Sequence, residues 1–316
     1  MDLDMDLAMA CPSCGHGAFE RSYIGEVRFG AFEYAYHRCL GCGSLYASPM
    51  PSPELLDEIY SPRYVNEHYS ESSEATFSLD LEAEATQALR QAARYRPGGR
   101  LLDVGCGAGR FLRAAAEAGF AAEGHELTAG AAAGAAERSG RPVHTGPLAE
   151  LCGAYDIVHM ADVLEHSPRP SVLLSEAVGL LAKHGVLVLR GPLENQRNLF
   201  HSVTVLQREA RTRIVGAAPV EMPPYHVNLF TLAGWRALVA SAGLYALLEQ
   251  VTEVHWPAPE RFSPGPVWAV KALSLAITRS AIGRRLALGN RVWGLFAPAS
   301  QAGMSREPRP ADASPG

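Results

Sequence analysis

The stretch LLDVGCGAGRFL, residues 101–112, decides the fold of this chain. Its apolar beginning carries one acid, Asp103, and leads into three glycines at alternate positions, Gly105, Gly107 and Gly109. A helix-forming run follows. A buried strand, a tight turn and a helix in this order are the entry to a doubly wound α/β sheet, whose ligands bind at the carboxyl ends of the strands. The glycines let the backbone approach such a ligand closely.

Three side chains around the turn indicate which cofactor it binds. In the dinucleotide fingerprint G-x-G-x-x-G/A, the third small position would fall on Arg110, where a long side chain would crowd the helix–strand contact. The carboxylate of Asp103 would repel a pyrophosphate, but it suits a ligand with an ammonium group and no phosphate, such as S-adenosylmethionine. Glu126 follows Gly105 by 21 residues, at the end of a second expected strand. An acid there can accept hydrogen bonds from both ribose hydroxyls.

Strand and helix patterns alternate along the chain, which predicts an α/β, doubly wound, mostly parallel sheet of seven strands. The strands are expected at residues 101–104, 120–125, 142–145, 155–160, 185–190, 244–252 and 290–297. The helices are expected at residues 54–60, 74–95, 108–118, 128–138, 170–182, 231–242 and 266–283, with an amphipathic stretch at 195–214. The last two strands would form an antiparallel hairpin.

Two segments together resemble class I S-adenosylmethionine-dependent methyltransferases over about residues 85–250. They are Asp103-Val-Gly105-Cys106-Gly107-Ala-Gly109, with Glu126 in register, and Asp156-Ile-Val-His-Met-Ala-Asp162-Val163-Leu-Glu165-His166. The resemblance implies a Rossmann-like fold and methyl transfer. A flavin, NAD or ligand-free Rossmann-like turn is the alternative. The expected cofactor-binding residues are Asp103, Gly105, Cys106, Gly107, Gly109, Glu126, Leu127, Asp162 and Val163.

Four cysteines near the start of the chain have the spacing of a metal site. Cys11-Pro-Ser-Cys14 and Cys39-Leu-Gly-Cys42 are two C-x2-C pairs with 24 residues between them, and a glycine follows each pair. This pattern predicts a zinc ribbon in which a closed four-thiolate site folds the module and does no chemistry. Two disulfides or a redox pair are the alternatives. Cys106 and Cys152 lie outside the pattern and are interpreted as structural.

Methyl transfer is an in-line displacement, and an oxygen or carbon nucleophile also needs a proton removed. The candidates for this chemistry are His226, His166, Tyr225, Tyr64 and Tyr69. His166 ends the loop after the fourth strand, and His226 follows two prolines in a loop beyond the fifth. Each candidate has a plainer interpretation, as a packing, capping or exposed loop residue.

The zinc module, the tyrosine-containing linker and the two histidines are similar to the zinc-containing sugar C-methyltransferases of deoxysugar and antibiotic pathways. That similarity implies a base at His226, with His166 and a linker tyrosine, Tyr64 or Tyr69, nearby. Two features differ from that family. Tyr225 stands where those enzymes carry an acid, and the chain after the core is too short for their additional C-terminal α/β domain.

Composition and charge indicate which classes of partner the chain binds. The chain has 316 residues and a net charge of −5, which gives no general attraction to nucleic acid, so a small-molecule acceptor such as a sugar or secondary metabolite is expected. No apolar run approaches a membrane span, and the acidic start lacks a secretory signal, which favours a cytoplasmic location. The apolar segment 266–283 favours a covering helix or a homodimer contact, with a membrane-surface contact as the alternative. An RNA methyltransferase and a non-catalytic cofactor-binding scaffold remain as alternative functions.

The expected organisation has six parts. They are a disordered tail (1–10), the zinc ribbon (11–50), a linker with a short helix and tyrosines (51–84), the cofactor-binding core (85–252), a C-terminal helix and last strand (253–300), and a second disordered tail (301–316).

Overall fold

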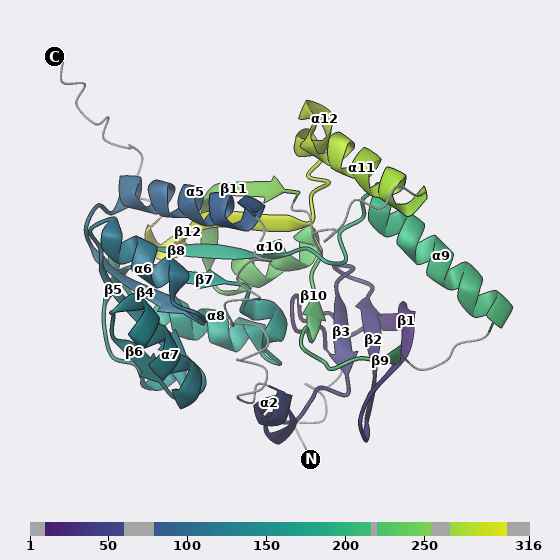
Figure 1. Ribbon diagram of the computed structural model, residues 1–316, viewed down its shortest axis with the longest axis horizontal. Helices are drawn as coiled ribbons and strands as arrows, with labels where there is room; N and C mark the ends of the chain where they lie inside the picture. Colours follow the sequence, from purple (N-terminus) through teal and green to yellow (C-terminus); the bar gives the residue numbers. More distant parts are fainter. Residues whose placement is uncertain (1–9, 60–78, 216–219, 254–265, 302–316) are drawn as a thin grey trace.

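The computed structural model describes residues 10–59, 79–215, 220–253 and 266–301. Tyr64 and Tyr69, and nearly all of the two expected tails, lie outside the described residues. The described chain contains a seven-stranded sheet with helices on both faces and a second, five-stranded sheet beside it (Figure 1).

The larger sheet has the strand order β11-β12-β8-β7-β4-β5-β6. Its strands are β4 (Arg100–Val104), β5 (Ala121–Glu126), β6 (Val143–Thr145), β7 (Tyr155–Ala161), β8 (Leu181–Pro192), β11 (Leu244–Thr252) and β12 (Arg291–Pro298). Strands β6, β5, β4, β7 and β8 are parallel, whereas β12 runs antiparallel to both β8 and β11. The predicted doubly wound fold and its closing antiparallel hairpin are confirmed.

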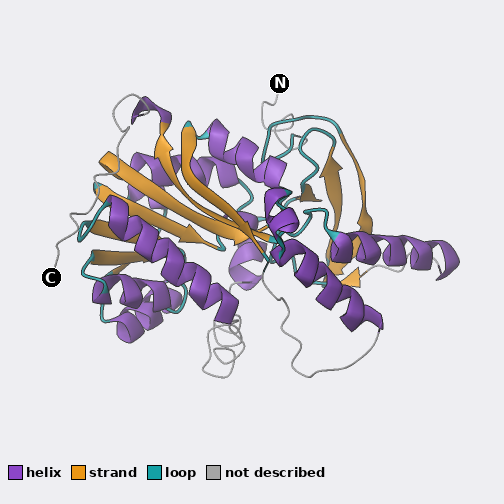
Figure 2. Cartoon of the chain, turned by 90° about the horizontal axis from the view of Figure 1, so that it is seen from above, coloured by secondary structure: helices purple, strands orange, loops and turns teal. Residues whose placement is uncertain are grey.

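The sheet is buried on both faces, as the continuous apolar runs of its central strands require. Leu102 and Leu187 pack in one core with Leu174 of α8 (Pro170–Gly179) and Trp235 of α10 (Leu232–Ser241). The neighbouring strand residues, such as Leu101, point to the opposite face. There they pack in a second core against α5 (Leu79–Tyr95), α6 (Arg110–Glu117) and α7 (Ala129–Ser139). Figure 2 shows helices along both sides of the twisted sheet.

The helix boundaries follow from capping residues in the sequence. Thr128 and Thr231 each accept a hydrogen bond from a backbone N–H of the first turn, of α7 and α10 respectively. Gly140 ends α7 in the left-handed conformation, and Pro170 begins α8. The single helix expected at 266–283 is instead two, α11 (Pro266–Arg279) and α12 (Ala281–Arg285), because Ser280 caps the second by accepting from Gly283 N.

The smaller sheet contains the cysteine module and a later part of the chain. Its order is β10-β3-β2-β1-β9, formed by β1 (Phe19–Phe29), β2 (Phe32–Cys39), β3 (Leu45–Ser48), β9 (Val220–Glu221) and β10 (Asn228–Leu229). In Figure 1 the green strands β9 and β10 flank the purple strands of the module. The module expected over residues 11–50 is therefore completed by strands more than 160 residues later in the sequence, which brings the segment around His226 against it.

The remaining elements lie outside the two sheets and the two cores described above. They are α2 (Pro53–Ile59), α9 (Leu199–Val215) and three short 3-10 turns, Leu148–Glu150, Leu164–His166 and Ala299–Gln301. Helix α11 lies beside α9, where Phe200 N donates to Ser274 Oγ. Within the described residues, none of the helices combines the length and the apolar character that crossing a bilayer needs.

Candidate active site

The glycine turn after β4 needs glycine for both conformation and space. Gly105, Gly107 and Gly109 have φ angles of 66°, 53° and 78°, in the left-handed region that favours glycine. A Cβ at Gly105 would lie 2.6 Å from Val163 Cγ2, and one at Gly109 would lie 2.9 Å from the carbonyl oxygen of Ala135. The turn is thus packed between the loop after β7 and helix α7, with its backbone facing the carboxyl edge of the sheet.

Glu126, the last residue of β5, lies against this turn. Its Oε1 accepts a hydrogen bond from Gly107 N at 2.6 Å, and its Oε2 accepts from Leu127 N at 3.1 Å. Burial raises the pKa of Glu126, an effect that the two N–H donors oppose. The expected ribose acceptor is therefore beside the glycine turn and holds it in place.

Asp103 is paired with a residue that the sequence analysis did not select. His159 of β7 donates from Nδ1 to Asp103 Oδ1 at 2.6 Å, and the His159 ring stacks on Phe111 with centroids 3.5 Å apart. Both members of the pair are almost wholly buried. Burial lowers the pKa of His159, and the carboxylate of Asp103 only partly opposes this, so the ring is neutral. A histidine inside an apolar strand was the available signal for this pair.

A pocket of about 960 Å³ opens over the turn, between α5 and the carboxyl ends of β4 and β7. Its size lies in the range of about 300–1,000 Å³ usual for small-molecule pockets. Of the nine expected cofactor residues, Asp103, Gly105, Cys106, Gly107, Gly109 and Asp162 line it. Glu126, Leu127 and Val163 are not among its lining residues. Leu127 is exposed, and Val163 packs against Gly105.

Asp162 has a left-handed backbone conformation and takes part in an ion-pair network with two buried arginines. Its φ is 55°, and its two carboxylate oxygens pair with Arg291 at 2.8 and 3.1 Å. Burial alone would raise the pKa of Asp162, but the charge and hydrogen bonds of Arg291 outweigh it and lower the pKa. Arg291 also approaches Glu84 of α5 at 3.4 Å, and Glu84 pairs with Arg190 of β8 at 3.1 Å. The network fastens α5 to the strand ends around the pocket.

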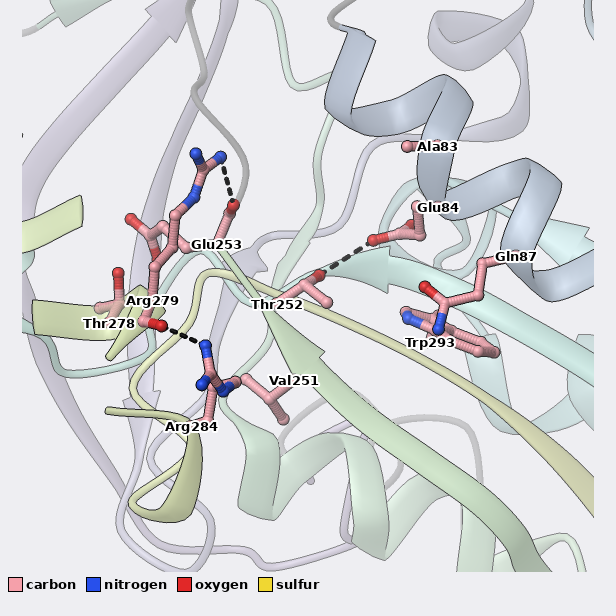
Figure 3. A pocket seen from close by; sticks show the side chains of 10 residues that line it. All are labelled: Ala83, Glu84, Gln87, Val251, Thr252, Glu253, Thr278, Arg279, Arg284 and Trp293. Atoms are coloured by element: carbon pink, nitrogen blue, oxygen red, sulfur yellow. Dashed lines mark hydrogen bonds between the residues drawn. The ribbon is translucent and has the colours of Figure 1, made fainter. Parts of the chain in front are cut away.

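Glu84 is also held from its other side, in a second pocket of about 280 Å³ shown in Figure 3. There Thr252 Oγ1 donates to Glu84 Oε2 at 3.0 Å, and Arg279 Nη2 donates to the carbonyl oxygen of Glu253 at 3.3 Å. Burial raises the pKa of Glu253 to about 7. This pocket mixes both signs of charge at the ends of β11 and α11, and none of the predicted site residues lines it.

The two candidate histidines lie together, in a group that we call the His–Glu cluster: Glu165, His166, Glu194 and His226. The ring centroids of His166 and His226 are 4.6 Å apart, and the two ring planes are nearly perpendicular. His226 Nδ1 donates to Glu194 Oε2 at 2.8 Å, and His166 Nδ1 donates to the carbonyl oxygen of Tyr225 at 2.8 Å. Tyr225 thus contributes its backbone, and the acid beside the loop histidine comes from Glu194, after β8. Sequence reasoning missed Glu194 because it is 32 residues from its partner.

The charged groups of the cluster shift one another's pKa values, and the charge of Asp162 shifts them too. Glu165 is 1% exposed, and burial, with the charge of Asp162, raises its pKa to about 8. Burial disfavours a charged His226, but the carboxylate of Glu194, assisted by Glu165 and Asp162, raises its pKa to about 9. Asp162, whose charge acts on both groups, lines the cofactor pocket, whereas the four cluster residues are not among its lining residues.

The cysteine module positions this cluster. Tyr36 of β2 donates its hydroxyl hydrogen to the carbonyl oxygen of His226 at 2.6 Å. Val227 N donates to the carbonyl oxygen of Glu165 at 2.9 Å, and the next residue begins β10, which pairs with β3. The backbone of His226 is therefore fixed between the module and the loop after β7.

The four cysteine sulfurs converge as the spacing predicts. The sulfurs of Cys11, Cys14, Cys39 and Cys42 all lie within 4.8 Å of one another. Cys14 Sγ is 3.5 Å from Cys39 Sγ, and Cys11 Sγ is 3.7 Å from Cys42 Sγ. Sulfurs about 2.3 Å from a tetrahedral zinc ion would be about 3.8 Å apart. All four thiols are free of disulfides, and the glycine after each pair, Gly15 or Gly43, has a positive φ. The donor set fits a thiolate-bound metal.

The sheet order, the glycine turn and the acids at the ends of β4 and β5 define a class I methyltransferase. A family model described as a methyltransferase domain matches residues 79–249, and the chain belongs to this family of enzymes. No match was found among curated proteins.

Three solved structures illustrate the likeness. An S-adenosylmethionine-dependent methyltransferase from Thermotoga maritima is 18% identical with a TM-score of 0.47, covering 75% of this chain and 98% of that one. Magnesium protoporphyrin IX methyltransferase from Synechocystis PCC 6803 is 15% identical with a TM-score of 0.48, covering 78% and 98%. An amino pentose methyltransferase from Micromonospora echinaspora, involved in calicheamicin biosynthesis, is 30% identical with a TM-score of 0.31, covering 34% and 49%.

Proposed function

We propose that this enzyme transfers the methyl group of S-adenosylmethionine to an oxygen or carbon atom of a small molecule, a sugar or secondary metabolite such as an antibiotic precursor. The observation that carries the proposal is the His226–Glu194 pair, with a 2.8 Å hydrogen bond, within electrostatic reach of Asp162 of the cofactor pocket. In its neutral form, a histidine oriented by a carboxylate is suited to remove the proton of an acceptor, and because the pKa of His226 is raised to about 9, alkaline pH favours that form.

The residues around the glycine turn fit the cofactor. Asp103, which lines the pocket, offers a buried carboxylate for the ammonium group, and Glu126, which accepts from Gly107 N of the turn, offers one for the ribose hydroxyls. When bound, S-adenosylmethionine supplies an electrophilic methyl group on a sulfonium. Asp162 and Val163 lie where the loop after β7 meets the turn, and they would shape the boundary between cofactor and acceptor.

The chain's own part in the reaction is to orient the acceptor and accept its proton. The proton of the acceptor's O–H or C–H bond would pass to His226 Nε2, while the methyl–sulfur bond of the cofactor would break and S-adenosylhomocysteine would be the leaving group. Glu194 accepts a hydrogen bond from His226 Nδ1, which keeps that hydrogen on the ring, and its carboxylate stabilises the positive charge that the ring acquires. His166 flanks the same space, and we propose Tyr225 and a linker tyrosine, Tyr64 or Tyr69, as further acceptor contacts.

We propose that Cys11, Cys14, Cys39 and Cys42 bind a structural zinc ion. A four-thiolate site leaves no open position, so this zinc would stabilise the module and not take part in methyl transfer. Reduced thiols in this arrangement favour a reducing compartment such as the cytoplasm. The net charge of −5 supports a small-molecule acceptor over nucleic acid. The homodimer contact through 266–283 stays a prediction.

The direct experiment measures release of S-adenosylhomocysteine while the enzyme is supplied with a panel of sugars, sugar nucleotides and hydroxylated metabolites. We expect turnover with one class, and a loss of kcat of about a hundredfold in His226→Gln with unchanged cofactor affinity. His184→Asn, at the opposite edge of the sheet, is the matched control and should retain activity. Wild-type turnover by His226→Gln would exclude His226 as the proton acceptor.

A further inference from the structure

Glu165 has a buried carboxyl group that makes no hydrogen bond within the described chain. The side chain is 1% exposed, and neither oxygen has a hydrogen-bond partner among the described residues. A buried polar group without a partner costs about 1–3 kcal/mol, and a charged one costs more. Such a group in a folded protein calls for a ligand that the protein atoms alone do not supply.

Hydrogen bonds to neighbouring groups fix the tautomers of the two histidines beside Glu165. The carbonyl oxygen of Tyr225 can only accept, so His166 must carry its hydrogen on Nδ1. His226 likewise donates from Nδ1 to the carboxylate of Glu194. In a neutral ring with this tautomer, the lone pair is on Nε2. A histidine that donates one ring N–H to a carboxylate or a backbone carbonyl is the usual arrangement of a metal ligand.

The three side chains are also close enough to share one ion. One ligand atom from each of Glu165, His166 and His226 lies within 4.8 Å of the others, and His166 Nε2 is 3.9 Å from Glu165 Oε1. Ligands about 2.1 Å from a tetrahedral ion are about 3.4 Å apart, so small side-chain rotations would complete the site.

We propose that Glu165, His166 and His226 form a second metal site, for a divalent transition-metal ion such as Zn²⁺, Co²⁺, Ni²⁺ or Fe²⁺. Two imidazoles and one carboxylate suit these ions better than Mg²⁺ or Ca²⁺, which prefer oxygen ligands. The ion would give the buried carboxyl oxygens of Glu165 the partner that they lack. This site differs from the four-cysteine site in its ligands and in its position, in the segments that follow β7 and precede β10.

The site has a consequence for activity that rests on the proposed function. His226 Nε2 is both the proposed metal ligand and the proposed proton acceptor, and one lone pair cannot serve both. Metal binding and proton removal therefore exclude each other, and filling the second site should switch methyl transfer off. The four-cysteine site has no such effect, because none of its ligands belongs to the His–Glu cluster.

Cobalt binding to the full-length protein tests the site, because thiolate and imidazole–carboxylate ligands give different spectra. After the four-cysteine site is filled, we expect Co²⁺ to bind a second equivalent without further thiolate-to-cobalt charge-transfer absorption. Glu165→Gln and His166→Gln should each bind one equivalent. Glu253→Gln is the matched control, because Glu253 also has a buried carboxylate oxygen without a partner, and it should bind two.

One equivalent in the wild-type protein, or two in both variants, would overturn the second site while leaving the proposed methyl transfer intact. Circular dichroism and thermal melting of each variant establish that lost binding is not lost folding. Methyl transfer is then measured as the second equivalent is added, and we expect activity to fall in step with occupancy. Full activity with both sites filled would overturn the switch and the assignment of His226 as the base.

Discussion

His159 Nδ1 lies 2.6 Å from Asp103 Oδ1, and the two residues are direct partners in the parallel pairing of β4 with β7. The sheet register itself therefore places a neutral imidazole beside the acid of the cofactor turn. The pair is buried, so the orientation of the Asp103 carboxylate is set before any ligand arrives. Pre-orientation of this kind reduces the entropy lost on binding.

Asp103→Asn should weaken S-adenosylmethionine binding by about tenfold to a hundredfold, because it removes the charge offered to the ammonium group and keeps the shape. Isothermal titration calorimetry measures the change. Asp156→Asn is the control, since Asp156 accepts from Arg100 N at the opposite end of the same strands and should keep wild-type affinity. If Asp103→Asn bound S-adenosylmethionine as tightly as Asp156→Asn, the role assigned to Asp103 would be wrong.

Glu126→Gln should lower cofactor affinity by about tenfold with little change in melting temperature. The amide oxygen of glutamine can still accept from Gly107 N, but the charge that strengthens bonds to the ribose hydroxyls is lost. Glu123→Gln provides the comparison on the same strand, because Glu123 pairs with Arg100 and His144 and not with the glycine turn. A larger loss of affinity in Glu123→Gln than in Glu126→Gln would contradict this assignment.

The cofactor half of the site could be predicted because its signal is local. Asp103, the glycine turn and the helix after it are contiguous, and Glu126 follows at the spacing of one βαβ unit. His159 was within the quoted motif but was not selected, because only the pairing of β4 with β7 makes it a neighbour of Asp103.

Glu194→Gln should lower kcat by about tenfold or more and leave cofactor affinity unchanged. The carboxylate stabilises the positive charge that His226 acquires when it takes a proton, whereas a neutral amide does so less well. Steady-state kinetics and calorimetry separate the two effects. Glu221→Gln, an exposed residue paired with Arg28, should behave as wild type. If kcat in Glu194→Gln matched the wild type, the pair would have no catalytic role.

The acceptor half could be predicted only in part. His166 and His226 were selected from their loops, and the structure brings their rings together. The carboxylate beside His226 comes from Glu194, a contact between distant segments that spacing does not reveal. Strands β9 and β10 have two residues each, too short for any periodic pattern, so their union with the cysteine module was invisible in the sequence.

Because β9 and β10 pair with the cysteine module, loss of the four-cysteine site should reduce turnover as well as stability. Cys39→Ser, or removal of the metal by a chelator, should loosen β2 and β3. Tyr36 of β2 holds the carbonyl oxygen of His226, and β3 pairs with β10 directly after it. We expect a lower melting temperature and a several-fold lower kcat, while S-adenosylmethionine still binds, because the glycine turn belongs to the other sheet. Cys152→Ser, an exposed thiol outside the module, is the control.

Tyr36→Phe separates stability from positioning. It removes one hydrogen bond worth about 1 kcal/mol, so a fall in kcat with metal content and fold unchanged would show that the module positions His226. Unaltered kcat in both Cys39→Ser and Tyr36→Phe would mean that the module contributes stability alone.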